Sequence, residues 1–221
     1  EHIYIQGMDG SNIAIFEVML KKEWFKEYEC ETKFIIGIHG AIFSKILATR
    51  DLVQHITMTC ENDNPDNMEL SFLHPSNSFD KHFRMPLIDY ESDMMSIPDT
   101  DYSVNMEIES KEWKKILDQL SNFGDSIHFS CKEESVHLIS GSIEGKMDIN
   151  ILSDKIETYE VDEGCDMNTQ FQLRYLQMMA NFQKINKYVN IMMSEDIPCC
   201  CKFKLDEDNY VQFYLAPQIN D

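Results

Sequence analysis

Apolar and polar side chains alternate along much of the chain with the period of a β-strand. Because successive side chains of a strand point to opposite faces, this alternation predicts strands that each bury one face. Turn-forming sequences such as "GMDGSN", between the first two segments, indicate hairpins. The alternating segments are residues 2–6, 12–20, 58–63, 67–75, 102–109, 126–151, 187–193, 199–205 and 210–217.

Helical spacing of apolar residues replaces the alternation in three segments, which are residues 39–51, 110–125 and 168–182. The second segment is the clearest, because Trp113 and Leu117 are among several apolar residues that recur on one face. We predict that Ser110 is the N-cap of this helix and that Gly124 ends it.

The order of these elements indicates an α+β fold with two similar halves. The first half has strands, a helix and strands, whereas the second has a strand, a helix, strands, a helix and strands. If the halves are structural repeats, the first lacks an opening strand and helix. We place the halves at residues 1–74 and 99–221. Residues 75–98 contain three prolines and predict a connector between them.

Composition and charge narrow the functional classes. The chain has 221 residues, 43% of them hydrophobic, which is enough for a globular core. A formal net charge of −20 by itself argues against nucleic acid, whose phosphates attract cations. Each predicted helix nevertheless points cations away from its apolar face, an ordinary feature of one helix but informative in three helices of an acidic chain. These cations are Lys45, Lys111, Lys114, Lys115 and Arg174.

No motif for catalysis, a cofactor or a metal is recognisable. The sequence "GSIEG" fits a hairpin turn better than a nucleophile elbow. The cysteines of "PCCCKF" lack the paired spacing of a zinc site, and we interpret them as strand residues, with Cys199 and Cys201 on one face. Seven cysteines without disulfide spacing indicate a reducing compartment. We therefore predict a protein that is not an enzyme and needs no cofactor.

Short motifs occur along the chain in a definite order: "MDGSN" with "IAIFEV", "SKIL", "SIPDTDY", "ISGSIEG", "LRYLQMM", "SEDIP" and "YLAPQI". In sequence and order these motifs resemble those of the proliferating cell nuclear antigen (PCNA) family of DNA sliding clamps. The resemblance runs from about residue 3 to residue 219. Family members begin with a strand and a helix ahead of the position of "HIYIQ", and this sequence lacks both.

This resemblance implies a homotrimeric ring with helices inside and antiparallel sheets outside. The ring would encircle double-stranded DNA without sequence specificity and act as a processivity factor. The implied partners are DNA polymerase, PIP-box client proteins of replication and repair, a clamp loader, and further copies of the chain. The implied location is the nucleus, or a viral replication site in an infected cell.

The resemblance places Lys45, Lys115 and Arg174 at positions that face DNA, with Lys111 and Lys114 as neighbours. Contacts to phosphates suit a clamp, because they carry no sequence information and are weakened by salt. Three positions at which the family usually has a basic residue differ here, namely Ala48, Asp118 and Asn181. We therefore expect a weaker hold on DNA than is usual for the family.

Two protein-binding surfaces are also implied. A client peptide would insert an apolar plug beside the connector, run along "APQI" and have its basic flanks attracted by the connector's acids. The implied docking residues are Met8, Ile15, Met95, Ile97, Pro98, Tyr102, Pro198, Tyr214, Ala216 and Pro217. Ring closure would pair edge strands at Asn67–Leu73 and Lys146–Leu152. The implied interface residues are Met68, Leu70, Phe72, Met147, Ile149 and Ile151.

Two alternative functions stay open. A subunit of a heterotrimeric checkpoint clamp would share the fold but would not assemble with itself. An acidic protein-interaction module or DNA mimic would not encircle DNA at all.

Overall fold

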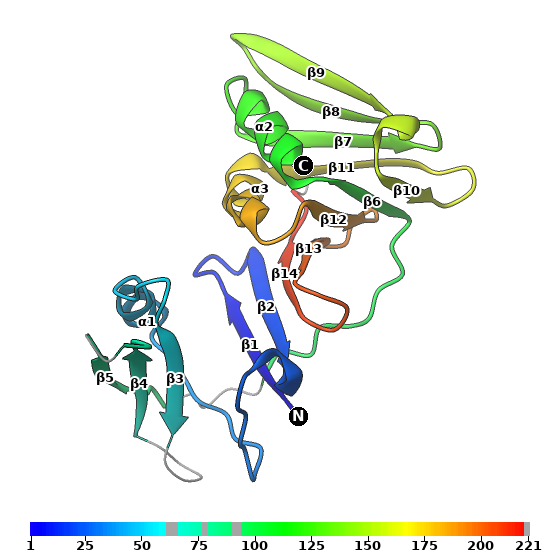
Figure 1. The fold of residues 1–221 in the computed structure, drawn as a ribbon. Helices are drawn as coiled ribbons and strands as arrows, with labels where there is room; N and C mark the ends of the chain where they lie inside the picture. The colour runs from blue at the N-terminus through cyan, green and yellow to red at the C-terminus, as the bar shows by residue number, and fades with distance from the viewer. Residues whose placement is uncertain (61–65, 77–78, 90–93, 219–221) are drawn as a thin grey trace. The chain divides into compact units, whose positions relative to one another are not determined.

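The chain folds into two compact units. One unit comprises Glu1–Tyr28 together with Ile97–Asp221, and the other is Glu29–Ser96 (Figure 1). Among the described residues, no helix has the length and apolar character needed to cross a membrane. In the computed structural model the described residues are 1–60, 66–76, 79–89 and 94–218.

The larger unit is built on a seven-stranded antiparallel sheet in the order β1-β2-β14-β13-β12-β6-β10 (Figure 1). The first hairpin of the chain pairs with its last strand in this sheet, so the compact units divide the chain differently from the predicted halves. The strands are β1 (His2–Met8), β2 (Ala14–Lys21), β6 (Val104–Glu109), β10 (Thr158–Val161), β12 (Tyr188–Met193), β13 (Cys199–Lys204) and β14 (Tyr210–Leu215).

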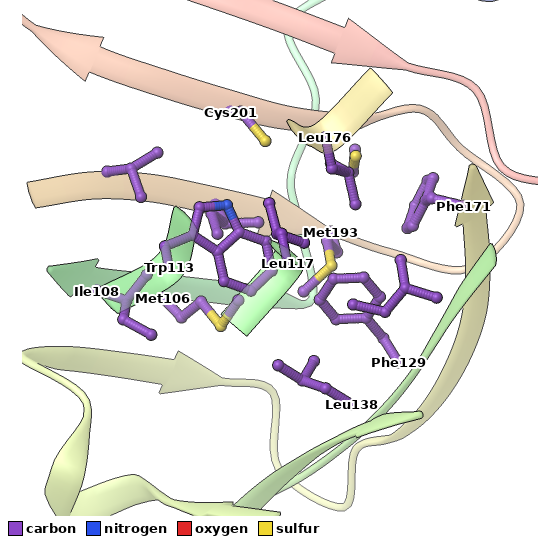
Figure 2. Close-up of a cluster of buried hydrophobic side chains, with 14 of the residues drawn as sticks. Met106, Ile108, Trp113, Leu117, Phe129, Leu138, Phe171, Leu176, Met193 and Cys201 are labelled. Carbon is purple, nitrogen blue, oxygen red and sulfur yellow. The ribbon is translucent and has the colours of Figure 1, made fainter. Parts of the chain in front are cut away.

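A four-stranded sheet, β11-β7-β8-β9, and two helices complete the larger unit. Helix α2 packs on α3 and contacts β6, β8 and β12, while α3 contacts β7 and β11. These elements share one core, in which Trp113 and Leu117 lie near Phe129 (Figure 2). The elements are β7 (Ser126–Lys132), β8 (Ser135–Ser142), β9 (Gly145–Leu152), β11 (Asp166–Gln172), α2 (Ser110–Leu120), α3 (Leu173–Ala180) and the 3-10 turns Lys22–Trp24, Ser153–Lys155 and Asn181–Lys184.

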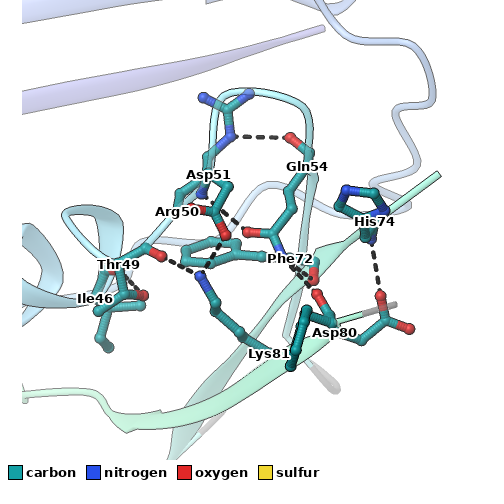
Figure 3. Close-up of polar contacts among 10 residues, drawn as sticks. Ile46, Thr49, Arg50, Asp51, Gln54, Phe72, His74, Asp80 and Lys81 are labelled. Carbon is teal, nitrogen blue, oxygen red and sulfur yellow. Dashed lines mark hydrogen bonds and ion pairs between the residues drawn. The ribbon is translucent and has the colours of Figure 1, made fainter. Parts of the chain in front are cut away.

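The smaller unit packs one helix on a three-stranded antiparallel sheet in the order β3-β4-β5. Its loop after the helix is fixed by Gln54, whose buried amide donates to the carbonyl oxygens of Phe72 and Phe79 (Figure 3). Lys81 adds an ion pair, with its Nζ 2.9 Å from Oδ2 of Asp51. The elements are α1 (Gly40–Leu47), β3 (His55–Cys60), β4 (Asn67–Leu73) and β5 (Lys81–Pro86).

Strand β5 lies inside residues 75–98, which we had predicted to be a connector throughout. In its sequence "KHFRMP" the alternation of apolar and polar residues is weak, because four of the residues are two basic residues, a histidine and a proline. Phe83 and Met85 nevertheless turn toward the core of the smaller unit. Pairing with β4, rather than a strong local pattern, makes this segment a strand.

The predicted boundaries of two helices are also wrong. Helix α2 begins with Ser110 and has Glu109 at its N-cap, and it ends at Leu120 rather than near Gly124. The backbone N–H of Ser110 donates to the carbonyl of Lys187, so a contact with the residue just before β12 fixes this end. Helix α3 begins only at Leu173, because the preceding residues of the predicted helix belong to β11 and pair with β7.

Candidate functional site

The lysines of α2 lie on the side of the helix opposite Trp113, which is buried. Lys111 and Lys115 are exposed, and Lys114 is half-buried. Lys114 contacts Asp118 one turn later, with 3.0 Å between Nζ and Oδ2. Lys115 contacts Glu112, with 2.9 Å between Nζ and Oε1. Because such exposed pairs contribute little, both ammonium groups can turn to another anion at small cost.

Arg174, at the start of α3, is exposed but held in place by its neighbour. Its Nη2 donates to the hydroxyl of Tyr175 at 3.1 Å, and the guanidinium lies 4.7 Å from the centre of that ring. The Tyr175 hydroxyl donates to Oδ2 of Asp9 at 2.9 Å. The turn between β1 and β2 thus orients Tyr175, the buried residue that follows the arginine and accepts its hydrogen bond.

Asp118 reduces the positive charge between the two helices. It pairs with Lys114 and also accepts a hydrogen bond from Nε2 of Gln177 on α3, at 3.2 Å. Gln177 donates a second bond to Oγ of Ser121, at 3.1 Å. An acid at this position therefore links α2 to α3 while lowering the attraction of the helix pair for phosphate.

Lys45 belongs to the smaller unit, where it is exposed on α1. The apolar residues Phe43 and Ile46 of the same helix pack against the core of this unit. Lys45 is thus free to contact a ligand, and its role toward DNA stays a prediction.

The predicted docking residues of the larger unit gather around one end of β1, β2 and β14. Met8, Ile15 and Tyr214 are directly paired across the three strands and therefore share one face. Tyr102 joins them to the loop before β13, because its hydroxyl donates to the carbonyl of Pro198 at 3.3 Å.

The segment that follows β14 stays attached to the same sheet and to its neighbour. The backbone N–H of Ala216 donates to the carbonyl of Ile13 at 3.0 Å, and that of Gln218 donates to Gln170 at 2.7 Å. Pro217 lies between them, half-buried. The last residue of "APQI" lies outside the described residues, and Met95 belongs to the smaller unit.

A hollow of about 440 Å³ lies beside this group of residues. Four of its lining residues were predicted docking residues, namely Ile97, Pro98, Tyr102 and Tyr214. The remaining lining residues were not predicted: Tyr4, Glu17, Asp99, Thr100, Met192, Lys202, Tyr210 and Gln212. The hollow is thus more polar and more aromatic than the predicted apolar set.

Glu17 is the centre of the unpredicted part, and this residue is 7% exposed. The hydroxyl of Tyr4 donates to its Oε2 at 2.6 Å, and that of Tyr214 donates to its Oε1 at 3.1 Å. Burial and the hydrogen bond to Glu17 raise the pKa of Tyr4 well above its ordinary value. Burial raises the pKa of Tyr214 as well, so both hydroxyls stay protonated and donate to Glu17.

The periodicity of the strands could have identified these residues, because it places them on the same face as the predicted docking residues. Tyr4 and Met8 are four apart on β1, as Tyr210 and Tyr214 are on β14, so each pair shares a face. Glu17 follows Ile15 by two positions on β2. The motif comparison drew attention to the apolar end of this face, and Glu17 was not singled out although it stands inside the motif "IAIFEV".

The sheet orders separate the two predicted subunit-interface strands. β4 lies between β3 and β5, so both of its edges are already paired, and Met68, Leu70 and Phe72 are core residues. The prediction that Asn67–Leu73 is an edge strand is therefore wrong. Among the described strands, β3 and β5 lie at the two edges of this sheet. The prediction did not identify β5 as an edge strand because its residues were assigned to the connector.

β9 does lie at the edge of its sheet, with β8 as its one neighbour among the described strands. Its predicted interface residues Met147, Ile149 and Ile151 are half-buried against the unit's own core. The alternate side chains, including Asp148 and Asn150, are exposed. Backbone groups and these polar side chains are thus what β9 offers to a partner.

The described residues hold no group of three or more His, Cys, Asp or Glu side chains arranged for a metal ion. Cys199 and Cys201 lie in the core of the larger unit, as the strand interpretation of "PCCCKF" requires. Cys200 faces the other way and is also buried, and burial raises the pKa of its thiol far above the ordinary value. These thiols are packing residues.

Comparison with protein-family models gives two matches that together cover almost the whole chain. Residues 1–95 match the model described as "Proliferating cell nuclear antigen, N-terminal domain", and residues 96–218 match "Proliferating cell nuclear antigen, C-terminal domain". The two matches meet between Met95 and Ser96, where the larger compact unit resumes at Ile97.

Proposed function

Because the chain belongs to the proliferating cell nuclear antigen family, we propose that it is a homotrimeric sliding clamp that encircles duplex DNA and tethers DNA polymerases and other enzymes of replication and repair. The family match confirms the predicted α+β clamp fold. In the proposed role the chain catalyses no reaction itself. It keeps a client enzyme close to the DNA template.

The observation that carries the proposal is the placement of cations in an acidic protein. The chain has a formal net charge of −20, yet Lys111, Lys115 and Arg174 are exposed on helices. In a closed ring, the acidic surface would repel DNA while these helices attract it. Weak contacts to phosphates leave the ring able to slide, and enclosure rather than affinity keeps it on DNA.

Ring closure is proposed to pair β5 of one copy with β9 of the next, since both are edge strands among those described. Edge pairing supplies backbone hydrogen bonds between copies. The interface would be heterologous, because a different strand contributes from each side, and a heterologous contact closes into a ring when its rotation allows.

Client proteins are proposed to dock at the face formed by Met8, Ile15 and Tyr214 and in the adjoining hollow, through PIP-box peptides. A clamp loader is the proposed partner for opening the ring. The proposed site of action is the nucleus, or a viral replication site in an infected cell.

Two measurements test the proposal. Light scattering on the native protein is expected to give the mass of three chains, whereas a checkpoint-clamp subunit would give one. Reversing Lys45, Lys115 and Arg174 to Glu together is expected to abolish stimulation of a DNA polymerase on a long primed template. A matched control reverses the exposed residues Lys26, Lys155 and Lys204. An equal loss in both variants, or no loss in the first, contradicts DNA contact through these helices.

A further inference from the structure

The hollow of the larger unit is lined by a carboxylate and tyrosine hydroxyls that an apolar plug cannot pair with. We propose that its polar half receives a lysine or arginine side chain of the client peptide. This inference rests on the proposed docking function and specifies which clients the site selects.

Aromatic rings make up much of the wall of the hollow. Tyr4, Tyr102, Tyr210 and Tyr214 all line it, and they come from β1, from the segment before β6 and from β14. The faces of tyrosine rings carry negative potential, so an ammonium or guanidinium within about 6 Å of a ring centre is attracted. Such walls also accept the methylene stem of a long basic side chain.

A buried carboxylate lies among these rings. Glu17 accepts hydrogen bonds from Tyr4 and Tyr214, which leaves each carboxylate oxygen with capacity for one more donor. Among the described residues, no Lys, Arg or His forms an ion pair with it. Since a buried charge is costly until a cation pairs with it, an incoming basic group would offset that cost.

The chain itself already places one ammonium group on this wall. Nζ of Lys202 lies 4.0 Å from the centre of the Tyr210 ring, and both residues line the hollow. This contact shows that the wall accepts a cation. It also makes Lys202 a competitor, because it occupies a ring that the client's basic group would use.

The charges of the lining favour the same occupant. Among the described residues of the lining, Glu17 and Asp99 are the acids, and Lys202 is the one basic residue. An uncharged apolar side chain would leave the Glu17 carboxylate desolvated without a cation. A lysine or arginine satisfies the carboxylate and the rings together.

The test compares two fluorescein-labelled peptides that differ at one position. Both are 12 residues long and carry two consecutive aromatic residues as plug, and the variable position, scanned through the flank, holds lysine or its uncharged analogue norleucine. Fluorescence polarisation with the full chain is expected to show the lysine peptide binding about tenfold more tightly at its best position. In Glu17→Gln this ratio is expected to fall to about twofold. The exposed control Glu144→Gln is expected to keep the wild-type ratio.

A second variant has an expected effect of the opposite sign and does not disturb the buried carboxylate. Lys202→Met frees the Tyr210 ring and is expected to raise the affinity for the lysine peptide about threefold. Lys204→Met removes an exposed lysine from the same face of β13 and serves as the control for net charge.

Equal affinity for the two peptides at every position overturns the inference and leaves the docking proposal standing. Equal gains from Lys202→Met and Lys204→Met overturn it as well, because general electrostatics would then explain the effect. If neither peptide binds, the docking proposal fails and the inference fails with it.

Discussion

Asp9 shows how one residue determines the turn on which the first hairpin depends. Its Oδ1 accepts backbone hydrogen bonds from Ile13 at 2.7 Å and Ala14 at 2.8 Å. Its Oδ2 accepts bonds from the backbone of Ser11 and from the hydroxyl of Tyr175. Donors on every side favour the ionised form, led by the Ala14 N–H, and lower the pKa of Asp9 from 3.8 to about 2.

Replacing Asp9 with Asn is therefore expected to destabilise the protein at neutral pH. A carboxylate whose pKa is lower in the folded state stabilises fully above its unfolded value of 3.8 and loses this contribution as the pH falls through about 2. In urea unfolding, the gap between the wild type and Asp9→Asn should narrow as the pH is lowered from 5 toward 2. Asp208→Asn, at an exposed turn, is the control. A gap that stays constant with pH would show that the charge is not responsible.

Single residues also mark the limit of prediction from sequence. Ser110 has the residue type of an N-cap, but it lies one position inside the helix, and its Oγ is buried without a hydrogen-bond partner among the described residues. The pairing of β6 with β12 determines where the strand gives way to the helix. Propensity identified the correct region, and tertiary contact moved the boundary.

At the scale of elements, Gly124 has a different role from the helix end that we predicted. It lies beyond α2, where the chain passes close to β8. A Cβ at this position would lie 2.8 Å from the carbonyl oxygen of Gly141 and 2.9 Å from Oγ of Ser140. Glycine is needed here because backbone approaches backbone, and sequence alone does not show such an approach.

Gly124→Ala is expected to lower the free energy of unfolding by about 1–3 kcal/mol, since the neighbouring strand must move to admit the methyl group. Gly145→Ala is a matched control, because its Cβ would meet Phe123 at 3.5 Å, an ordinary contact distance. Urea unfolding of the two variants measures the difference. Equal losses would show that intrinsic glycine effects, rather than the contact with Gly141, dominate.

Elements with strong internal patterns were predictable, and those made by pairing were not. The hairpins from β7 to β9 follow their alternation closely, and Trp113 marks the buried face of α2 as expected. β5 and the start of α3 failed because their local patterns are ambiguous and a neighbouring strand decides them. The lining of the hollow was predicted only in part, because the motif comparison singled out Tyr102 and Tyr214 but not Glu17.

At the scale of the whole molecule, the proposed ring depends on which strand edges would join its copies. Because β5 rather than β4 lies at an edge of its sheet, the charges that an interface would bring together differ from those of the predicted interface. β5 exposes His82 and Arg84, whereas the middle of β9 exposes Asp148 and Asn150. Opposite charges across paired strands stabilise by roughly 0.2–1 kcal/mol, and like charges destabilise. Heterologous pairing of β5 with β9 therefore has a favourable charge pattern in addition to backbone bonds.

A charge exchange tests this arrangement. Arg84→Glu and Asp148→Lys are each expected to weaken assembly, shifting the trimer–monomer midpoint to higher concentration in sedimentation velocity by about fivefold per interface. Asp148→Lys also removes the contact with Nδ1 of His137 at 3.3 Å, so Asp148→Asn separates that loss from repulsion across the interface. The double variant restores opposite charges at every interface of a ring, since each copy contributes β5 to one neighbour and β9 to the other. It should assemble better than either single variant. If the double variant is as weak as the worse single variant, β5 and β9 do not meet, and ring closure must use other edges.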